Sequence, residues 1–458
     1  MAERLSSSDM SSLLAERGPI HVNVGGTMIM EGEPPGFEEL LGHVSARLSL
    51  IPRYRQRVTE APLVQITNPS WRDDPRFDLR WHVRRAALPR PGSRAELREL
   101  VGQIISQPLD LSRPLWQLHL IEGLEGGGHA YLSTTHHALV DGVSAIDVGT
   151  VLLDPDPEVR GPAEAEPWEP EETDAAMLFA SEAAAVVRRP IAAARRAAHG
   201  ALSMPLDTAT RVMRTAEGFA GLAAGGPAAP RSTLNVEVGR DRRVAWASAD
   251  LAALKGARAV EGSTVNDVIL AVVSGALARF LKGRGDPVPE RLVALVPVSI
   301  RRAEEAGGLG NRITSIQVPL PLGLTDPLER LSAIHSDTER LKASEQARAA
   351  SLIIEATGWT PPTINRVLAD AISRPLTWNL VVSNVPGPQT PFFLLGRRLV
   401  EVYPCVPLSP QNHALSVGVV SYDGRVFFGL NGDRDALADI EDLATAIGSA
   451  LAEQTAAA

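Results

Sequence analysis

The stretch "TTHHALVDGVSA", residues 134–145, holds side chains that could move a proton. His136 and His137 are adjacent, and Asp141 follows the second histidine by four residues, just before Gly142. Because an imidazole titrates near neutral pH, a neutral histidine can take a proton from an alcohol and return it to a leaving group. A nearby carboxylate can fix the loop that aims the ring, and a glycine permits a close backbone approach.

Two other interpretations of this stretch stay open at this point. A metal site needs at least three converging ligands, whereas neighbouring histidines on a strand point to opposite faces. The sequence has no HExxH motif or His/Cys cluster to supply the remaining ligands. The pair could also be two hydrogen-bonded histidines at a strand end, without any chemistry. The general-base interpretation becomes stronger only if other stretches of the sequence agree with it.

The elements around the histidines place them at the end of a strand. Residues 129–137 read as a strand, the residues after them as a turn, and Val143 begins a predicted helix. His137 would then lie at the C-terminal end of a strand, where αβ proteins commonly hold active groups. Alternating apolar and polar residues predict earlier strands at 20–30, 79–88 and 115–124. Apolar residues spaced by three and four predict helices at 37–51 and 95–106.

The composition changes after residue 153. Residues 154–174 hold nine acidic residues, one arginine and five prolines, which indicates an exposed linker. Residues 175–216 are rich in alanine and arginine and predict helices that Pro190 and Pro205 interrupt. This connector could lie on an anionic lipid surface, or it could equally be a crossover that packs across both halves of the molecule.

A second αβ region begins at about residue 232. Its predicted helices are 263–283, starting at Ser263 or Thr264 and stopping at Gly283, and 326–344. Its predicted strands are 242–251, 291–300, 312–322 and 378–388, followed by a hairpin over 413–433 that turns at Asp423–Gly424. We therefore expect an N-terminal subdomain over 1–153, a linker and connector over 154–231, and a C-terminal subdomain over 232–458. Each half should have its own sheet.

Length, composition and charge exclude several classes of protein. A chain of 458 residues is too long for one ordinary core, and 44% hydrophobic with 22% charged residues is typical of a globular protein. The first 18 residues do not contain the apolar region of a secretory signal, and no uncharged apolar run reaches about 18 residues, so we expect the protein in the cytoplasm. A net charge of −9 argues against a nucleic-acid binder. Cys405, the single cysteine, excludes an intrachain disulfide.

The motif "HHALVDG" resembles the HHxxxDG motif of the bacterial wax ester synthase/acyl-CoA:diacylglycerol acyltransferase family, within the CoA-dependent acyltransferase superfamily. Further stretches resemble that family in the same order along the chain, from about Ser6 to the last helix. They are "PLDLSRPLWQ" (108–117), "STVNDVILAVVSGALARFL" (263–281), "VPVSIR" (296–301), "LGNRITSIQVPLP" (309–321), "SNVPGP" (383–388) and "SYDGRVFFGLNGDRD" (421–435). The chain departs from the family at "DMSSLL" and "PIHVNV", which bears on the shape of the acyl channel.

The resemblance implies an α/β fold of the α+β sandwich type, with two chloramphenicol-acetyltransferase-like subdomains and a tunnel at their interface. It implies an O-acyltransferase that moves a long-chain acyl group from acyl-CoA to diacylglycerol or a fatty alcohol, giving triacylglycerol or wax ester. His137 would be the general base, and CoA would leave as its thiol. No acyl-enzyme and no cofactor would be needed, in agreement with the absence of a GxSxG nucleophile motif.

The resemblance also assigns supporting roles around the motif. Asp141 would be turned away from the substrate and paired with an arginine of the other subdomain, for which Arg301 matches best. Losing one partner of such a buried pair costs about 3–5 kcal/mol, so Asp141 would act on geometry more than on chemistry. His136 would lie on the opposite strand face and support the motif, and Gly142 would permit the turn.

Further candidate residues each have a functional and a plain structural interpretation. Asn266 and Asp267 could stabilise the oxyanion or orient the substrate at a helix start, or they could simply cap that helix. Pro114, Leu115 and Trp116 could line the acyl channel or only pack the core. The polar residues that could face the tunnel or CoA, or could serve turn geometry, are Asn311, Ser383 and Asn384.

Two alternative functions remain beside the acyl-CoA-dependent one. A condensation-like enzyme would use acyl or peptidyl carrier proteins instead of CoA. A non-catalytic protein would keep the tunnel to carry lipid or coat lipid droplets. Because diacylglycerol and long alcohols reside in membranes, we expect peripheral association with the inner face of the membrane or with lipid droplets. Acyl-CoA and the lipid alcohol are the expected partners, and nucleic acid is not.

Overall fold

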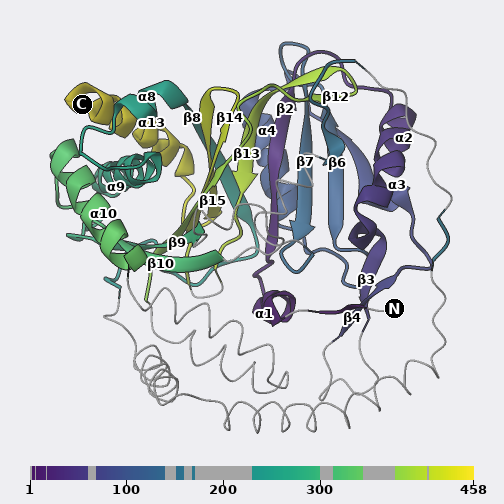
Figure 1. Ribbon diagram of the computed structural model, residues 1–458, viewed down its shortest axis with the longest axis horizontal. Helices are drawn as coiled ribbons and strands as arrows, with labels where there is room; N and C mark the ends of the chain where they lie inside the picture. Colours follow the sequence, from purple (N-terminus) through teal and green to yellow (C-terminus); the bar gives the residue numbers. More distant parts are fainter. Residues whose placement is uncertain are drawn as a thin grey trace, which may run out of the picture.

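Two sheets stand side by side in the molecule, each covered by helices (Figure 1). The computed structural model describes residues 3–5, 7–16, 18–59, 69–139, 151–158, 168–170, 229–299, 313–343, 377–409 and 412–458. The expected connector helices of 175–216 lie outside these residues. The mixed α/β architecture with two sheet-rich halves agrees with the expected fold class.

The N-terminal sheet carries the histidine pair. Within the described residues it has six strands, in the order β12 (Phe393–Leu394), β13 (Arg397–Cys405), β2 (Asn23–Met30), β7 (His129–His136), β6 (Trp116–Glu122) and β5 (Val83–Ala87). Every pairing is antiparallel except that of β5 with β6. A small sheet below it has the order β1 (Glu3–Arg4), β4 (Ser70–Asp73) and β3 (Gln56–Thr59).

The C-terminal sheet also has six strands in the part of the chain that the structure describes. Their order is β10 (Ile313–Leu320), β9 (Leu292–Ser299), β11 (Leu380–Pro386), β14 (Leu415–Tyr422), β15 (Arg425–Asp433) and β8 (Arg242–Asp250). Strand β11 runs parallel to both neighbours. The β14–β15 hairpin turns at Asp423 and Gly424, both with positive φ, which confirms the predicted turn.

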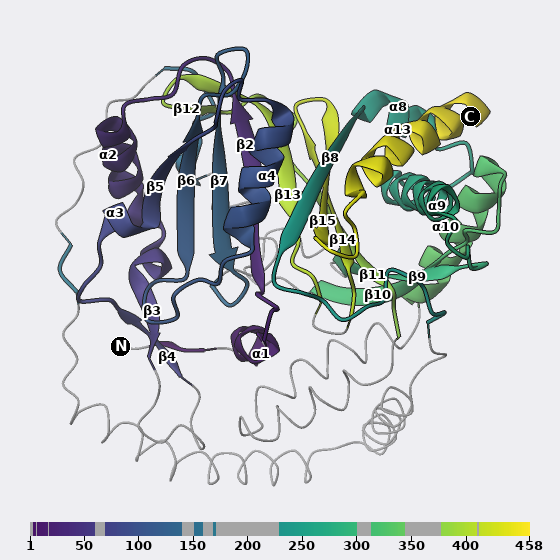
Figure 2. The ribbon, with the colours of Figure 1, turned by 180° about the vertical axis from the view of Figure 1, so that it is seen from behind.

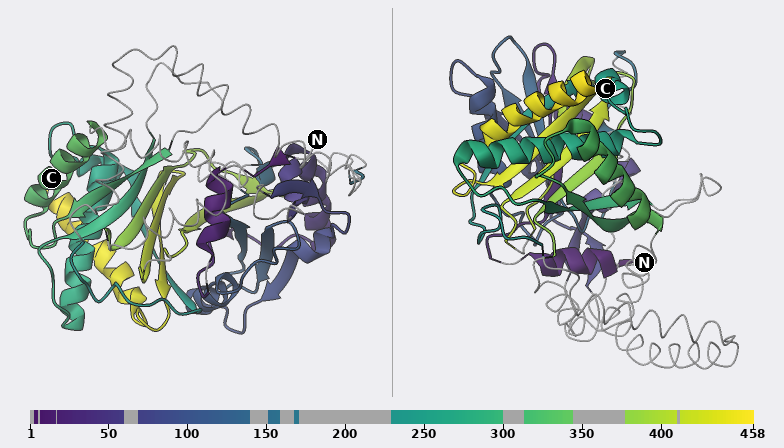
Figure 3. Two further views of the ribbon diagram at one scale, coloured as in Figure 1. Left: turned by 90° about the horizontal axis from the view of Figure 1, so that it is seen from below. Right: turned by 90° about the vertical axis from the view of Figure 1, so that its left-hand side faces the viewer.

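Three helices lie across the outer face of the C-terminal sheet (Figure 3). They are α9 (Val265–Arg284), α10 (Pro327–Ala343) and α13 (Ile440–Ala457), and a short α8 (Leu251–Gly256) precedes them. Helix α9 is buried on nearly all sides because the sheet, α10 and α13 surround it. Thr264 caps its start, as one of the two predicted caps. The predicted stop at Gly283 is wrong, since the helix ends at Arg284 and is capped by Gly285, whose φ of 75° suits glycine.

The helices of the N-terminal half are α1 (Ser7–Ala15), α2 (Phe37–Arg47), α3 (Leu79–His82) and α4 (Arg94–Ile105), with 3-10 turns at Leu48–Leu50 and Pro52–Arg55. Helix α4 lies between the N-terminal sheet and β8 (Figure 2). The predicted strand over 79–88 is correct only from Val83. Its first residues form α3 because the Asp78 carboxylate accepts the Arg80 N–H and caps a helical turn.

The two sheets do not divide at the predicted boundary. Strands β12 and β13 come from the C-terminal part of the chain, yet β13 pairs with β2 in the N-terminal sheet. Gly418 and Gly429 face each other across β14 and β15, and a Cβ on Gly429 would lie 1.9 Å from the Pro404 carbonyl oxygen. The paired glycines therefore let β13 lie directly against the C-terminal sheet.

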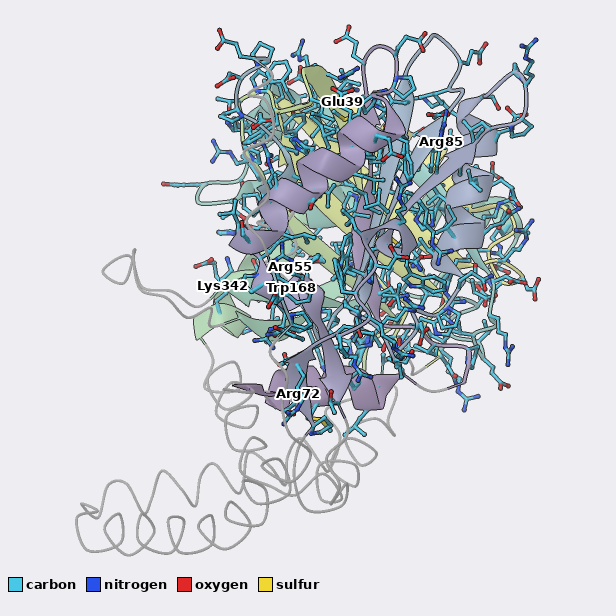
Figure 4. All side chains as sticks on the ribbon, turned by 90° about the vertical axis from the view of Figure 1, so that its right-hand side faces the viewer. Glu39, Arg55, Arg72, Arg85, Trp168 and Lys342 are labelled. Carbon is cyan, nitrogen blue, oxygen red and sulfur yellow. The ribbon has the colours of Figure 1, made fainter. Side chains whose placement is uncertain are left out.

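One segment of the acidic linker contacts the N-terminal half. Trp168 lies beside Arg55 (Figure 4), whose guanidinium carbon is 5.0 Å from the indole centroid. The ring also meets Phe77 edge-on, at a centroid distance of 5.9 Å. The linker is thus anchored at its tryptophan, and Asp154 is anchored by Arg47 at 2.6 Å.

Candidate active site

The central strand β7 delivers the histidine pair to one end of the N-terminal sheet. It lies between β2 and β6 and ends at His136, one residue earlier than predicted. The His136 N–H donates to the Leu115 carbonyl at 2.9 Å. The His137 N–H donates to the Val22 carbonyl, also at 2.9 Å. Backbone bonds from both neighbouring segments therefore fix the strand end.

The ring of His136 is buried, with a hydrogen bond at Nδ1 and a carboxylate close to Nε2. Its side chain is fully inaccessible to solvent. The Ala138 N–H donates to Nδ1 at 2.9 Å, and Nε2 lies 3.3 Å from Glu16 Oε1. The same Glu16 oxygen accepts the Val22 N–H at 3.2 Å. Glu16 follows α1, so the first helix is tied to the histidine pair.

The polar groups around Glu16 favour its ionised form. Burial alone would raise the pKa of Glu16, but the interaction with His136 and the Val22 N–H outweigh burial and lower it. Burial lowers the pKa of His21, which is also close enough to Glu16 to feel its charge. At neutral pH the group therefore holds one carboxylate and an uncharged His21.

His137 differs from His136 in its exposure. Its side chain is half-buried, whereas that of its neighbour is fully buried. The residues after it form a turn, in which the Leu139 N–H donates to the His136 carbonyl at 2.9 Å. Asp141 and Gly142 lie outside the described residues, so their predicted roles stay predictions.

The structure brings only some of the candidate residues of the C-terminal half together. The Asn384 side-chain amide donates to Asn266 Oδ1 at 3.2 Å, which joins β11 to the start of α9. Strand alternation turns the half-buried Ser383 to the other face of β11, the face that Gly418 shares and that packs on β13. Arg301 and Asn311 lie outside the described residues.

Asp267 is engaged in helix capping and helix packing. Its carboxylate accepts the Thr264 N–H at 2.9 Å, the Thr338 hydroxyl at 2.8 Å and a contact from His335 Nδ1 at 3.1 Å. Burial would raise the pKa of Asp267, but these hydrogen bonds together lower it. The side chain is fully buried. These contacts favour the capping interpretation for Asp267, while Asn266 stays half-buried at the helix start.

Pro114, Leu115 and Trp116 are all buried. Leu115 packs in a cluster with Ala138, directly after the histidine pair. Trp116 donates its indole N–H to the Tyr54 carbonyl at 2.8 Å and stacks on His82 with centroids 4.7 Å apart. These contacts suit core packing that supports the motif. A lining role in an acyl channel stays a prediction.

A pocket of about 580 Å³ opens between β6 and the C-terminal end of α4. Its wall mixes apolar and polar side chains, from Trp81, Arg84, Leu100, Gln103, Ile104, Gln107, Pro108, Leu109, Asp110, Gln117 and His119. Leu109 also belongs to the cluster of Leu115 and Ala138. One wall of the pocket therefore packs against the segment that follows the histidine pair.

Arg242 joins the two halves close to this site. Its guanidinium donates to the Pro19 carbonyl at 2.8 Å, between α1 and β2, and its backbone N–H donates to Ser106 at 2.8 Å. Burial lowers the pKa of Arg242 and raises that of Cys405 to about 12. The Cys405 thiol is therefore protonated at neutral pH and a poor nucleophile.

Within the described ranges, no three His, Cys, Asp or Glu side chains gather closely enough to hold a metal ion. None of the helices that the structure describes has the length and apolar character to cross a bilayer.

Glu16, His21 and Arg242 were not among the residues singled out from the sequence. Glu16 lies 120 residues before His136, and its neighbours in the sequence resemble those of any acidic residue after a short helix. Only the pairing of β2 with β7, which sets Asn23 opposite His136, brings the end of α1 to the motif. No local sequence signal distinguishes these residues.

Models of two protein families match most of the chain. The wax ester synthase/diacylglycerol acyltransferase catalytic domain matches residues 5–269, and the WS/DGAT C-terminal domain matches residues 309–454. A protein of Mycobacterium tuberculosis named diacylglycerol O-acyltransferase is 31% identical over 490 residues, covering 100% of this chain and 98% of that one. A second such protein of that species is 32% identical over 468 residues, covering 99% and 96%.

Solved structures share the fold over its whole length. The wax ester synthase/diacylglycerol acyltransferase from Marinobacter aquaeolei VT8 superposes with a TM-score of 0.69 at 27% identity, covering 98% of each chain. The starter condensation domain of rhizomide synthetase has a TM-score of 0.59 at 14% identity, covering 100% of this chain and 95% of that one. The second likeness is one of fold alone.

Proposed function

This chain belongs to the wax ester synthase/diacylglycerol acyltransferase family and is an acyltransferase, and on that premise we propose that it transfers a long-chain acyl group from acyl-CoA to diacylglycerol. The product is triacylglycerol. The full-length relatives that bear the name diacylglycerol O-acyltransferase support this acceptor. A fatty alcohol is the second acceptor, giving wax ester, and the name of the Marinobacter enzyme supports it.

His137 acts as the general base in this proposal. The observation that carries it is the contrast within the pair, because His137 is half-buried at the strand end while His136 is sealed inside with Glu16. A neutral imidazole takes the proton of the acceptor hydroxyl as its oxygen attacks the thioester carbonyl. The tetrahedral intermediate then collapses, the C–S bond breaks, and the imidazolium returns the proton to the CoA thiolate.

The transfer is direct and needs no acyl-enzyme or cofactor. The raised pKa of Cys405 supports this, since that thiol would make a poor nucleophile. The Asn266–Asn384 pair at the start of α9 is proposed to orient the substrate or to stabilise the oxyanion. Asp141, paired with Arg301, is proposed to hold the turn that Gly142 permits. Asn311 and Ser383 are proposed to face the tunnel or CoA.

We further propose that the protein works in the cytoplasm at the surface of the membrane or of lipid droplets. Its lipid acceptors reside there, and the connector 175–216 carries the basic and apolar residues that such a surface would bind. Flotation with liposomes tests this, using the full chain and a chain without residues 175–216. Equal binding of the two proteins would remove the connector as the contact.

Release of free CoA tests the catalytic proposal. The protein is mixed with palmitoyl-CoA and either dioleoylglycerol or hexadecanol, and the CoA thiol is followed with a thiol reagent. We expect His137→Ala and His137→Gln to lower kcat by about 100-fold or more, because general-base catalysis contributes factors of that order. Product analysis from the same reactions ranks the two acceptors.

Glu39→Ala is the matched control for folding in this assay. Glu39 caps the distant helix α2 through the Gly36 N–H, at 3.2 Å. The Glu39→Ala variant should keep the wild-type rate if the loss of kcat is specific to the histidine. Equal CoA release by wild type and both His137 variants would refute the general base.

A further inference from the structure

A closed circuit of polar contacts surrounds the histidine pair. It is formed by Glu16, Val22, His136, His137 and Ala138. Glu16 Oε1 accepts the Val22 N–H at 3.2 Å and lies 3.3 Å from His136 Nε2. The Val22 carbonyl accepts the His137 N–H at 2.9 Å. The Ala138 N–H returns to His136 Nδ1 at 2.9 Å. One Glu16 carboxylate oxygen thus contacts Val22, which is hydrogen-bonded to His137. The same oxygen contacts the His136 ring, which accepts the Ala138 N–H.

The Ala138 contact fixes the tautomer of a neutral His136 ring. Nδ1 can accept the Ala138 N–H only when it carries no proton, so the neutral ring must carry its proton on Nε2. That nitrogen lies 3.3 Å from Glu16 Oε1. With Nδ1 occupied by the Ala138 N–H and the side chain fully buried, His136 has no accessible acceptor for a substrate proton.

The carboxylate is suited to this role by its charge and burial. Its side chain is 15% exposed, and the pKa of Glu16 lies below the usual value despite the opposing effect of burial. Glu16 is then ionised at every pH at which the imidazole base would be neutral. An ionised acceptor makes a stronger hydrogen bond than a neutral one in such surroundings.

We propose that Glu16 is a positioning residue, which holds the backbone of His137 in the productive place through Val22 on one side and through His136 and Ala138 on the other. The inference rests on the proposed function, in which His137 is the base. Without Glu16 the strand end loses its anchor to the first helix segment, and the His137 ring shifts against the substrate. A misplacement of about 1 Å can cost about 100-fold in rate.

Steady-state kinetics of three variants test the proposal. We expect Glu16→Ala to lower kcat by about 10–100-fold with little change in KM for acyl-CoA, because the orientation of the base changes and the binding surface does not. Glu16→Gln keeps an acceptor oxygen without the charge, so it should recover most of that loss and fall only about 3–10-fold. Glu39→Ala, which removes a capping carboxylate in α2, is the matched control.

A histidine spectrum gives a readout that does not depend on activity. In protein labelled with ¹⁵N-histidine, the Nε2–H signal of His136, assigned by its absence in His136→Gln, should be protected from exchange with water. We expect it to persist in Glu16→Gln and to be lost or exchange about tenfold faster in Glu16→Ala. An unchanged signal in Glu16→Ala would overturn the proposal.

The two proposals can fail separately. If wild type releases no CoA, the proposed function is wrong, and the imidazole signal alone then decides whether Glu16 positions the pair. If wild type is active and Glu16→Ala keeps its kcat within about twofold, or loses no more than Glu39→Ala, the positioning role is refuted. Equal loss in Glu16→Ala and Glu16→Gln would also refute it, because the acceptor oxygen would then have no effect.

Discussion

Adjacent positions on a strand end give the two histidines different surroundings. Consecutive side chains of a strand point to opposite faces, so His136 and His137 cannot share one environment. His136 turns into the interior, where its Nδ1 accepts the Ala138 N–H and its Nε2 lies 3.3 Å from Glu16. His137 keeps partial access to solvent. One ring can therefore hold the other residue in place without taking part in proton transfer.

This division predicts different losses of stability for the two alanine variants. His136→Ala removes a fully buried ring and leaves Glu16 and the Ala138 N–H without it, so the free energy of unfolding should fall by about 2–4 kcal/mol. His137→Ala removes a half-buried ring and should cost less than about 1 kcal/mol. Urea unfolding followed by circular dichroism measures both. Similar losses in the two variants would contradict the division.

The sequence motif was sufficient to place His137 at a strand end but not to find its support. The strand, the turn and the two histidines are local features within ten residues, which a motif can carry. Glu16 reaches His136 only through the pairing of β2 with β7, and no local pattern encodes that pairing. Asp267 shows the converse, since its spacing from Thr264 already allowed the capping interpretation that its contacts favour.

At the scale of elements, β13 decides how the two halves meet. Its Tyr403 ring stacks on Trp246 of β8 at a centroid distance of 4.6 Å and meets Phe427 of β15 edge-on. Arg94 of α4 pairs with Glu401 of the same strand at 2.9 Å. A strand of the N-terminal sheet thus packs against the other sheet and fixes the interface between the two halves.

The glycines under β13 give a prediction for this interface. Gly429→Ala would drive a Cβ into the Pro404 carbonyl, so the free energy of unfolding should fall by about 3 kcal/mol or more. Gly448→Ala in α13 is the matched control, because a Cβ there meets no atom within 4 Å. That change should be neutral or stabilise the helix by up to about 1 kcal/mol.

Urea unfolding of both glycine variants, with intrinsic tryptophan fluorescence as the probe, measures the difference. Trp246 lies at this interface and is one of the seven tryptophans that contribute to the emission. Equal stability of Gly429→Ala and Gly448→Ala would mean that β13 tolerates displacement and does not fix the interface.

Most of the elements were predictable because each has its own periodicity. The strand over 129–137 was off by one residue at its end, and the helix over 95–106 was off by one residue at both ends. The predictions that failed depend on long-range strand pairing or on helix capping. The partner of β13 lies some 370 residues earlier in the chain, and the start of the strand over 79–88 yields to the Asp78 cap. Two halves of similar length suggested two self-contained sheets. Strand β13 contradicts this, because it comes from the C-terminal part of the chain and belongs to the N-terminal sheet.

At the scale of the whole molecule, the halves share one apolar cluster. It includes Tyr131 of the N-terminal sheet with Val244 and Phe427 of the C-terminal sheet. The histidine pair belongs to the first half and the Asn266–Asn384 pair to the second. A reaction that needs groups from both halves would therefore depend on the packing that joins them.

Buried uncharged histidines make this packing sensitive to acid. Burial lowers the pKa of His82, His119 and His413 to about 4. In the unfolded chain each would titrate near 6.5. Between pH 6.5 and 4 the unfolded chain therefore binds more protons, so the free energy of unfolding falls as the pH falls through this window and is constant above it with respect to these groups.

His119 offers a direct test of this acid sensitivity. It is 7% exposed in the pocket wall, and its Nδ1 is buried without a hydrogen-bond partner among the described residues. His119→Leu removes the group that the unfolded chain protonates preferentially. The variant should therefore lose about 2 kcal/mol less than wild type between pH 7.5 and pH 5.

Urea unfolding of wild type and His119→Leu at the two pH values measures this difference in slope. Gln117→Leu is the matched control, because Gln117 lies in the same pocket wall on the same strand and does not titrate. Its change in stability should be the same at both pH values. If His119→Leu and Gln117→Leu follow the wild-type pH dependence equally, His119 is protonated in the folded protein as readily as in the unfolded chain. Acid sensitivity would then have to come from His82 and His413, whose rings donate to the backbone carbonyls of Trp116 and Trp378.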